Sequence, residues 1–526
     1  MPETLARRTW EGLSEAEKRE VKVLGSIALM KPILDKLDVA QIINGYCSDG
    51  SEFSHGKAVE IMVANRLMAP KPLYHVEQWA KEIAVEEVYG IPPEKLNDDR
   101  LGRALDAIYP YLGEIWDRIV AEAIVTYNLD FYSIIYDVTS FYFEGEYEGS
   151  ELIQYGYSRD WKPDKVQANL GLDVTSKEGV PLSYKLLPGS TADENTVLEN
   201  IDRLKALRER LPKGSKAPIL VIGDGKTISP KAVLKYHEIC LDYLAPVKTT
   251  EKIRELVQSV SDEEFEDNRL NYKGRDEGAY WAVFRPFTFC YEGRKVEDLA
   301  LVVKSTSKLS RDRASRMKAI EERSERLKHI QSKLNQRKYK SKGYVERRVH
   351  KALKGSRIKK YFRVEVTGEY GNLSLNWSLD NETMERDKAL DGKYILVSSR
   401  RFSSAEEMFL RYKERNRVEQ RISNLKGNLR VRPVFLEREE RIASLVFVIV
   451  LSLLVFSIVE ALCRRGGLTK MTARAAFGCF EHLSLMRFRF KDGSSLVVVG
   501  ELLPVQDAIL NAMCLPRPQA YVGLHR

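Results

Sequence analysis

Cysteine is scarce in this chain, and the few cysteines present are not spaced in pairs. The 526 residues contain 6 cysteines, and no C-x-x-C motif occurs among them. This spacing argues against a disulfide framework and against a structural zinc site, and it suits a reducing cytoplasm. The first twenty residues also lack the apolar core of a signal peptide. We therefore expect a cytoplasmic protein.

Charge is almost missing from one long apolar segment, residues 442–463, in which Glu460 is the single charged residue. By length and hydropathy alone this segment is a candidate for a transmembrane helix. A helix that is apolar on all sides can instead be buried between a sheet and another layer. Because the segment follows a capped helix after a short loop, we expect a buried core helix and no membrane partner.

Acidic residues are sparse in a second segment, residues 308–363. It contains 21 Lys and Arg against 5 Asp and Glu, a net charge of +16, so the rest of the chain carries −7 of the total of +9. One strongly basic segment in an otherwise mildly acidic protein indicates a nucleic-acid partner, although a solvated helical excursion is the alternative. We expect contacts to the DNA backbone from Arg337, Lys338, Lys340 and Lys342.

The length predicts two to four domains, and a 44% share of hydrophobic residues predicts a globular protein with a substantial core. Residues 1–127 show helical periodicity throughout, with Asn97 as an N-cap, and are expected to form an all-helical DNA-binding domain. Three β-rich runs, a helix, a strand, a helix and a strand then indicate an α/β domain with a mixed sheet. The runs are residues 130–143, 166–175, 181–189, 193–207, 217–225, 229–240 and 242–247.

An insertion interrupts this α/β pattern. Residues 250–390 combine β-rich segments with the basic helical run, and the strand at 392–399 resumes the first pattern. The next helix begins at Ser404, which forms a capping-box pattern with Glu407. The expected parts are a helical domain, a catalytic core in two pieces, the mainly β insertion between them and a small C-terminal α/β region. Their bounds are 1–127, 128–249, 250–390, 391–467 and 468–526.

Three acids are candidates for a catalytic site. Asp137 and Asp224 each follow an apolar run, so both are expected at strand ends, where an Asp can also simply begin a turn. Glu419, on a helix packed beside those strands, would be a third oxygen ligand. Three carboxylates suit Mg²⁺, and two such ions can activate a nucleophilic oxygen and stabilise a leaving oxygen at one phosphate.

The helix that carries Glu419 has a second pattern. Tyr412, Arg415, Glu419 and Lys426 are separated by three, four and seven residues, which places all four on one face of a continuous helix. A solvated face with ordinary ion pairs would show the same spacing. The apolar stripe of this helix lies to one side, so the four polar residues would border a cleft.

Taken together, these residues resemble a known family. Asp137, Asp224 and Glu419 in this order, on an RNase H-like sheet, resemble the DDE transposases of bacterial and archaeal insertion sequences. The Y-x2-R-x3-E-x6-K spacing is similar to the signature of the IS-Four superfamily, and segments 97–106, 392–399 and 429–435 resemble a group within it. The sequence departs at Asp224-Gly225-Lys226, where relatives often have Asp-Arg-Gly or Asp-Ala-Gly.

The resemblance implies a mechanism and roles for single residues. It implies that Asp137, Asp224 and Glu419 bind two Mg²⁺ ions, with Mn²⁺ as a substitute. Tyr412, Arg415 and Lys426 would hold phosphates near the transposon end. Cleavage at terminal inverted repeats, hairpin formation and joining to target DNA would follow, in a homodimer associated with the prokaryotic nucleoid. Some relatives stack a flipped base on a tryptophan of the insertion, for which Trp281 and Trp377 are candidates.

Two other functions remain open from the sequence. The first is an RNase H-like nuclease that cleaves DNA without strand transfer. The second is a DNA-binding protein derived from a transposase that has no catalytic activity. The three intact acids argue against the second function, and an assay of strand transfer separates the first.

Overall fold

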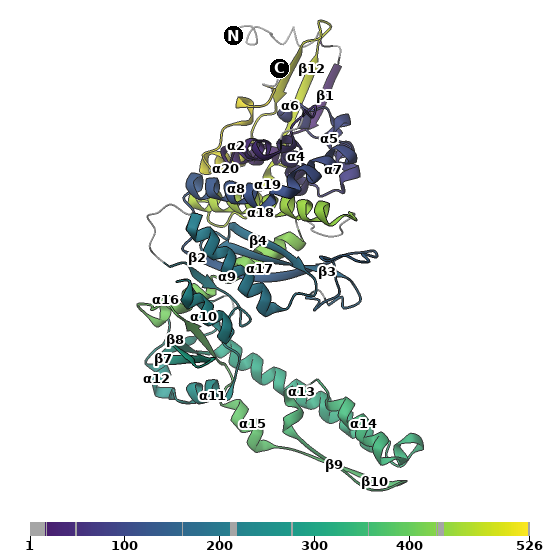
Figure 1. The fold of residues 1–526 in the computed structure, drawn as a ribbon, viewed down its shortest axis with the longest axis vertical. Coiled ribbons are helices and arrows are strands. Elements are labelled where there is room, and N and C mark those ends of the chain that lie inside the picture. Colours follow the sequence, from purple (N-terminus) through teal and green to yellow (C-terminus); the bar gives the residue numbers. More distant parts are fainter. Residues whose placement is uncertain are drawn as a thin grey trace. The chain divides into compact units, whose positions relative to one another are not determined.

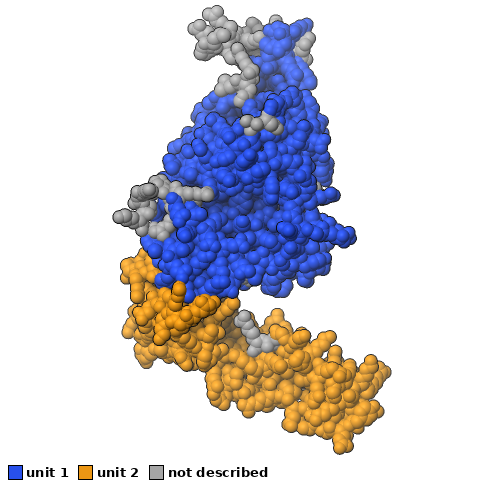
Figure 2. All heavy atoms as spheres, in the orientation of Figure 1, with its two compact units in different colours: residues 1–242, 413–526 blue, residues 243–412 orange. Residues whose placement is uncertain are grey.

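The structure, a computed structural model, describes residues 16, 18–47, 50–159, 161–210, 218–274, 277–355, 357–427, 429 and 436–523. The chain divides into two compact units (Figure 2). Unit 1 comprises residues 1–242 and 413–526, and unit 2 comprises residues 243–412. Each unit is described by itself. The segment 429–435 lies outside the described residues except for Leu429.

The N-terminal part of unit 1 is helical, as the periodicity predicts, with one exception. Asn97 caps its helix as expected, because its side chain accepts a hydrogen bond from the Arg100 amide at 2.9 Å. The exception is a first strand, β1, which pairs antiparallel with a strand near the C-terminus. The elements are β1 Lys18–Val23, α2 Ile27–Lys36, α3 Val39–Tyr46, α4 His55–Met68, η1 Leu73–His75, α5 Val76–Glu82, α6 Val85–Tyr89, η2 Pro93–Lys95, α7 Asp98–Ile108, η3 Tyr109–Tyr111 and α8 Leu112–Tyr127, where η marks a 3₁₀ helix.

The core of unit 1 is the mixed sheet expected of an RNase H-like fold, with strand order β4-β3-β2-β5. Strands β2 and β3 and strands β3 and β4 pair antiparallel, whereas β2 and β5 pair parallel. Helix α9 provides the connection between β4 and β5 and packs against α10. The elements are β2 Ser133–Tyr142, β3 Gln167–Thr175, β4 Pro181–Pro188, α9 Asp193–Arg210, β5 Leu220–Ile222 and α10 Pro230–Glu238.

Helices α17 (Asn416–Lys426) and α18 (Glu439–Arg465) complete this core. Helix α17 contacts β2, β3 and α18, and α18 contacts β4 and the N-terminal helices α4 and α7 (Figure 1). By length and composition α18 could cross a membrane, but 94% of its most apolar window is buried inside the protein. This burial matches the core helix expected for residues 442–463.

The C-terminal region consists of a helix, a hairpin and a second helix, in agreement with the small α/β region predicted for residues 468–526. Strand β12 lies between β1 and β13, and all pairs are antiparallel. The turn of the hairpin contains Gly493, whose φ of 78° lies in the left-handed region that glycine tolerates. The elements are α19 Ala473–Phe480, β12 Ser484–Arg489, β13 Ser495–Val499, α20 Pro504–Ala512 and η6 Pro518–Ala520.

Unit 2 contains the strands β6-β11-β8-β7 in that order and the predicted insertion. The long strands β7 and β8 pair along their full lengths, and β11 pairs antiparallel with both β8 and β6. Helix α16 is capped by Ser404, which accepts from the Glu407 amide at 3.1 Å. The elements are β6 Asp242–Pro246, α11 Glu251–Gln258, α12 Asp262–Glu266, β7 Tyr280–Tyr291, β8 Arg294–Ser305, α15 Asn381–Lys388, β11 Lys393–Ser398 and α16 Ala405–Lys413.

The basic segment forms an arm within unit 2. Helices α13 (Thr306–Ser332) and α14 (Lys342–Leu353) pack side by side, and α14 packs on strand β9 (Phe362–Glu369), which pairs with β10 (Asn372–Leu379) (Figure 1). The arm has its own hydrophobic cluster, which includes Leu327, Val345 and Leu375. Two short 3₁₀ helices, η4 Arg337–Lys340 and η5 Arg357–Tyr361, complete it.

Candidate active site

Asp137 lies in the middle of β2, not at the strand end that the sequence suggested. Strand β2 continues to Tyr142 because it pairs with β3 over its whole length. On its other edge, β2 pairs with the short strand β5 only as far as Ile135 opposite Ile222. Asp137 therefore lies two residues beyond the end of the parallel pairing, at an open stretch of the β2 edge.

Asp224 lies two residues beyond the same pairing, on the β5 side. The parallel register of Ile135 with Ile222 thus brings Asp137 and Asp224 next to each other. The Asp224 carboxylate folds into its own turn, where Oδ1 accepts from the Lys226 amide at 2.8 Å. The turn is tight, because a Cβ at residue 223 would lie 1.9 Å from the Thr227 hydroxyl oxygen, so only glycine fits there.

Glu419 lies in the first turn of α17, the helix that packs on β2 and β3. Val418 and Leu425 bury the apolar side of this helix, as the stripe predicts. The Glu419 side chain is half exposed, and its Oε1 accepts from Arg415 Nη2 at 2.6 Å. The third acid is thus held above the sheet by an arginine four residues before it.

The three acids interact electrostatically. Burial raises the pKa of the Asp137 carboxyl to about 6, and the negative charges of Asp224 and Glu419 raise it as well. A hydrogen bond from the Val138 amide and the Arg415 guanidinium oppose this rise. Acids from a turn and a helix thus lie within electrostatic reach of a largely buried acid on a strand.

The helix that carries the spacing of four polar residues is not continuous. Helix α16 ends at Lys413, and α17 begins at Asn416. At the junction the Arg417 amide bonds to the Glu414 carbonyl and the Val418 amide to the Arg415 carbonyl, so i→i+3 bonds replace i→i+4 bonds. The prediction of one continuous helix for all four residues is therefore wrong. Arg415 is the N-cap residue of α17, which carries Glu419 and Lys426.

Tyr412 belongs to α16 and, in the division of the chain, to unit 2, whereas Arg415 belongs to unit 1. In α16 the buried side chains are Met408 and Phe409. Lys426 is the last residue of α17. Within unit 1 the structure thus brings Arg415 to Glu419, and it places Lys426 two helical turns further along the same helix.

Comparison with known families agrees with this geometry. Residues 132–455, well over half of the chain, match the family model described as the transposase DDE domain. The chain belongs to the DDE transposases. Residues 19–121 match a second model, described as a domain of unknown function. The family match covers both pieces of the mixed sheet and the insertion between them.

Similar solved structures include a piggyBac transposase in a synaptic complex with hairpin DNA. It is 11% identical to this transposase, and the similarity covers 88% of this chain and 82% of that one with a TM-score of 0.39. No curated protein matches this chain.

Enzymes of this family generally use divalent metals, and the donors of this transposase fit such an ion. Asp137, Asp224 and Glu419 offer only hard carboxylate oxygens, and their mutual repulsion is what a divalent cation would relieve. In the described part of the chain, no three His, Cys, Asp or Glu side chains converge closely enough to hold a metal ion. The reason is visible in the contacts: Asp224 bonds to its own turn, and Glu419 bonds to Arg415.

The four basic residues singled out in the insertion gather where α13 and α14 meet. Arg337, Lys338, Lys340 and Lys342 are exposed. The loop is fixed to the hairpin β9–β10, because Asn335 bonds to both the carbonyl and the amide of Leu373 at 3.0 and 2.7 Å. The transposase therefore presents these charges on a fixed backbone.

Sequence reasoning missed Arg421, which holds α17 in place. This side chain is 2% exposed and donates to the backbone oxygens of Gly179 and Glu178 at 2.7 and 3.0 Å, and to Glu460 Oε1 at 3.2 Å. Glu460 is the single charge of the apolar segment 442–463. An arginine three residues after Val418, beside the apolar stripe, was the signal that could have predicted this ion pair.

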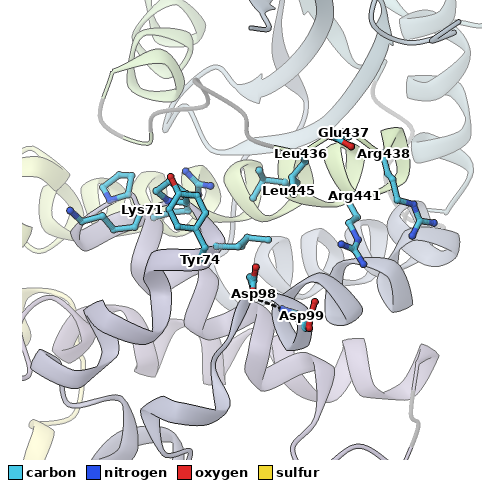
Figure 3. A pocket seen from close by; sticks show the side chains of 13 residues that line it. Lys71, Tyr74, Asp98, Asp99, Leu436, Glu437, Arg438, Arg441 and Leu445 are labelled. Carbon is cyan, nitrogen blue, oxygen red and sulfur yellow. Dashed lines mark hydrogen bonds between the residues drawn. The ribbon is translucent and has the colours of Figure 1, made fainter. Parts of the chain in front are cut away.

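A cavity elsewhere in unit 1 does not include the acids. It is lined by residues of the N-terminal helices and by the start of α18, among them Tyr74, Asp98 and Arg438 (Figure 3). Arg441 also borders it and forms two hydrogen bonds with Asp106, at 2.9 and 2.7 Å. Both carboxylates and guanidinium groups line this cavity, so its lining does not favour a ligand of one charge.

Proposed function

We propose that this DDE transposase cuts DNA at the ends of an insertion sequence and joins the freed ends to target DNA. The observation that supports the proposal most is the placement of Asp224 two residues beyond β5 beside Asp137, with Glu419 on the helix that packs on β2. Burial raises the pKa of Asp137, and the negative charges of Asp224 and Glu419 add to that rise. Carboxylates whose charges influence one another at a partly buried site are typical of catalytic metal sites. The partner is double-stranded DNA, both as terminal inverted repeats and as target.

The proposed reaction has two kinds of step. In the first, water attacks a phosphorus atom at the transposon end, the P–O3′ bond breaks and a 3′-hydroxyl leaves. In the second, that hydroxyl attacks a phosphodiester of the opposite strand, the P–O3′ bond to the flanking DNA breaks, and a hairpin forms. Water then breaks the P–O3′ bond of the hairpin and frees the 3′-hydroxyl again. This hydroxyl attacks a phosphodiester of the target DNA, whose own P–O3′ bond breaks. Divalent ions, two Mg²⁺ with Mn²⁺ as a substitute, activate the attacking oxygen and stabilise the leaving one.

Each residue of the candidate site has its own role in the proposed reaction. Asp137, Asp224 and Glu419 supply the oxygen donors. Arg415 neutralises part of the negative charge of these carboxylates. It would have to release Glu419 before that carboxylate could bind a cation. Because a guanidinium freed in this way can bind a phosphate with two hydrogen bonds, Arg415 then holds DNA together with Lys426 and Tyr412. We further propose that two protomers pair two DNA ends.

The first test is loss of the acids. Asp137→Ala, Asp224→Ala and Glu419→Ala should each abolish Mg²⁺-dependent cleavage of a duplex that contains the flanking DNA of the gene, while circular dichroism and binding stay near those of the wild type. Glu199→Ala is the control, because Glu199 is an exposed acid on α9 outside the site. Near-normal cleavage by any of the three variants removes that residue from the metal site.

A second assay separates transposition from simple nuclease activity. Nick, hairpin and joined product are followed on a gel for Arg415→Lys, Arg415→Ala and Lys426→Ala. We expect the first nick to persist and the later products to fall, since a bent or unpaired end must be held for those steps. A wild-type protein that yields nicks without hairpin or joined product would be an RNase H-like nuclease, and one that only binds would be non-catalytic.

A further inference from the structure

Three aromatic side chains are exposed on the loop between β2 and β3 in unit 1. The exposed fractions are 66% for Tyr155, 75% for Tyr157 and 89% for Trp161. Single exposed aromatic residues are normal on protein surfaces. Three within seven residues of one loop are unusual, because each leaves a large apolar surface in water, and such groups mark binding sites.

The backbone that carries the two tyrosines is fixed to the sheet. Gln154 forms a pair of backbone hydrogen bonds with Gln167, at 3.0 and 2.9 Å. The Gln167 side chain donates to the carbonyl of Tyr157 at 3.0 Å. Gly156, between the tyrosines, packs so closely that a Cβ there would lie 1.9 Å from the Gly189 carbonyl oxygen. The rings are thus exposed although their backbone is held, which lowers the entropic cost of binding.

The loop is linked directly to one of the catalytic acids. The Lys226 ammonium lies over the Tyr157 ring, 5.4 Å from its centre, and the amide of the same lysine donates to Asp224 Oδ1. Arg159, two residues after Tyr157, is tied to the core strands through Ser140 and Asn169. One aromatic ring and one cation are therefore held next to the acid site.

The earlier, acidic part of this loop, which includes Tyr147 and Glu151, packs on another element of unit 1. The Glu151 amide bonds to Glu439 Oε1 at 2.9 Å, and the Tyr147 hydroxyl bonds to the Leu436 carbonyl at 3.0 Å, so this part packs at the start of α18. The exposed rings follow it in the chain, in a stretch that also carries Lys162.

The tryptophans of the insertion are less suited to stacking. Trp281 is 9% exposed and has Lys304 over its ring at 5.5 Å. Trp377 is partly buried against the cluster of the arm, with the Phe362 ring centre 6.0 Å away. Both rings are therefore more covered than the three rings of the β2–β3 loop.

We propose that Tyr155, Tyr157 and Trp161 form a stacking platform for unpaired nucleobases of the DNA next to the acid site. Aromatic rings stack on any base, so the platform holds single-stranded DNA without reading its sequence, while Lys226 meets a phosphate. The inference rests on the proposed function, since strand cleavage and hairpin formation are the steps that leave bases unpaired.

The test compares single-stranded and duplex DNA. Full-length Tyr157→Ala/Trp161→Ala protein is titrated, in EDTA to prevent cleavage, with a fluorescent oligothymidylate and with the same strand paired to oligoadenylate. Loss of stacking should raise the Kd for the single strand about 5- to 150-fold and that for the duplex less than about twofold. The slope of log K against log salt should stay unchanged, because stacking releases no counterions.

Two further variants serve as controls. Tyr157→Phe/Trp161→Phe keeps the rings and should restore single-strand affinity. Tyr370→Ala removes a tyrosine of similar exposure, 77%, on the turn between β9 and β10, and should leave it unchanged. Three results would overturn the platform. The first is an equal loss of affinity for single-stranded and duplex DNA, and the second is failure of the phenylalanine variant to restore single-strand affinity. The third is that these residues bind a second protein chain instead of DNA.

The outcomes for the platform and for the proposed function are separable. Acid-dependent cleavage together with wild-type single-strand binding by Tyr157→Ala/Trp161→Ala would refute only the platform. Selective loss of single-strand binding together with cleavage that survives Asp137→Ala would refute the proposed transposase chemistry and leave the platform standing.

Discussion

The acid site of unit 1 and the basic arm of unit 2 both concentrate charge of one sign, but they do so in opposite environments. At the acid site a few carboxylates are forced together on a sheet, and burial holds the pKa of Asp137 near 6. In the arm many cations lie on the outside of a small hydrophobic cluster, where water and salt screen them. A cation bound at the first site would relieve the repulsion among its carboxylates, whereas the second would attract a polyanion through the number of its charges.

The same substitution should have very different effects in the two regions. Arg421→Ala removes a buried guanidinium beneath α17 and takes one ion-pair partner from Glu460, which keeps Arg464, so the free energy of unfolding should fall by about 3 kcal/mol. Arg347→Ala on the exposed face of α14 should change it by less than about 0.5 kcal/mol. Urea unfolding of both variants measures the difference, and equal effects would show that Arg421 is not a stabilising clamp.

At Asp137 we expect a smaller change in the free energy of unfolding, and one of opposite sign, because the substitution should stabilise the protein. Because the pKa of Asp137 is raised in the folded protein, the ionised carboxylate lowers the free energy of unfolding, and it does so fully above pH 6. This destabilisation disappears as the pH falls below about 4, the pKa of the carboxyl in the unfolded chain. Asp137→Asn should therefore stabilise the protein by about 1–3 kcal/mol at pH 8 in EDTA, with the gain shrinking between pH 6 and 4. Thermal unfolding at several pH values measures it.

The matched control for Asp137→Asn is Glu199→Gln, which replaces an exposed acid and should give no such pH-dependent gain. Divalent metal provides a further check, because Mg²⁺ bound to the wild type should offset the penalty and narrow the difference between the two proteins. A variant that is less stable than the wild type at pH 8 would contradict the electrostatic interpretation of the site.

The smallest effect on stability should come from the arm. Replacing Arg337, Lys338, Lys340 and Lys342 with glutamine should leave the free energy of unfolding within about 0.5 kcal/mol, because these side chains are exposed. Duplex binding should become less salt-dependent, with the slope of log K against log salt falling by up to about 0.9 for each DNA phosphate that the variant no longer neutralises. An unchanged slope would make the segment a solvated helical surface.

Local patterns in the sequence were sufficient for much of the architecture. The β-branched runs predicted β2, β3, β4, β7 and β8, and the cap at Asn97 was found where the pattern placed it. The burial of α18 followed from its uniform apolarity together with the α/β context. The spacing of the acids led to the family that the match over residues 132–455 shows. The strands, the cap and the apolar helix depend on residues close together in the chain, whereas the acids that led to the family lie far apart in it.

The features that the sequence did not predict depend on contacts between distant residues. Strand β1 exists because it pairs with β12, more than four hundred residues later. Asp137 is interior to β2 because β3 extends the strand past the point where the parallel partner ends. The break between α16 and α17 follows no proline or glycine, so no local signal marked it.

By itself, then, the sequence determined most of the elements and which residue types can carry the chemistry, because helix and strand periodicity are local properties. Tertiary structure decided which of those residues meet. The register of Ile135 with Ile222 puts Asp137 beside Asp224, and the buried Arg421 sets α17 on the sheet so that Glu419 completes the group. It also decided which aromatic rings stay in water, since exposure depends on what packs over a ring and not on its neighbours in the chain.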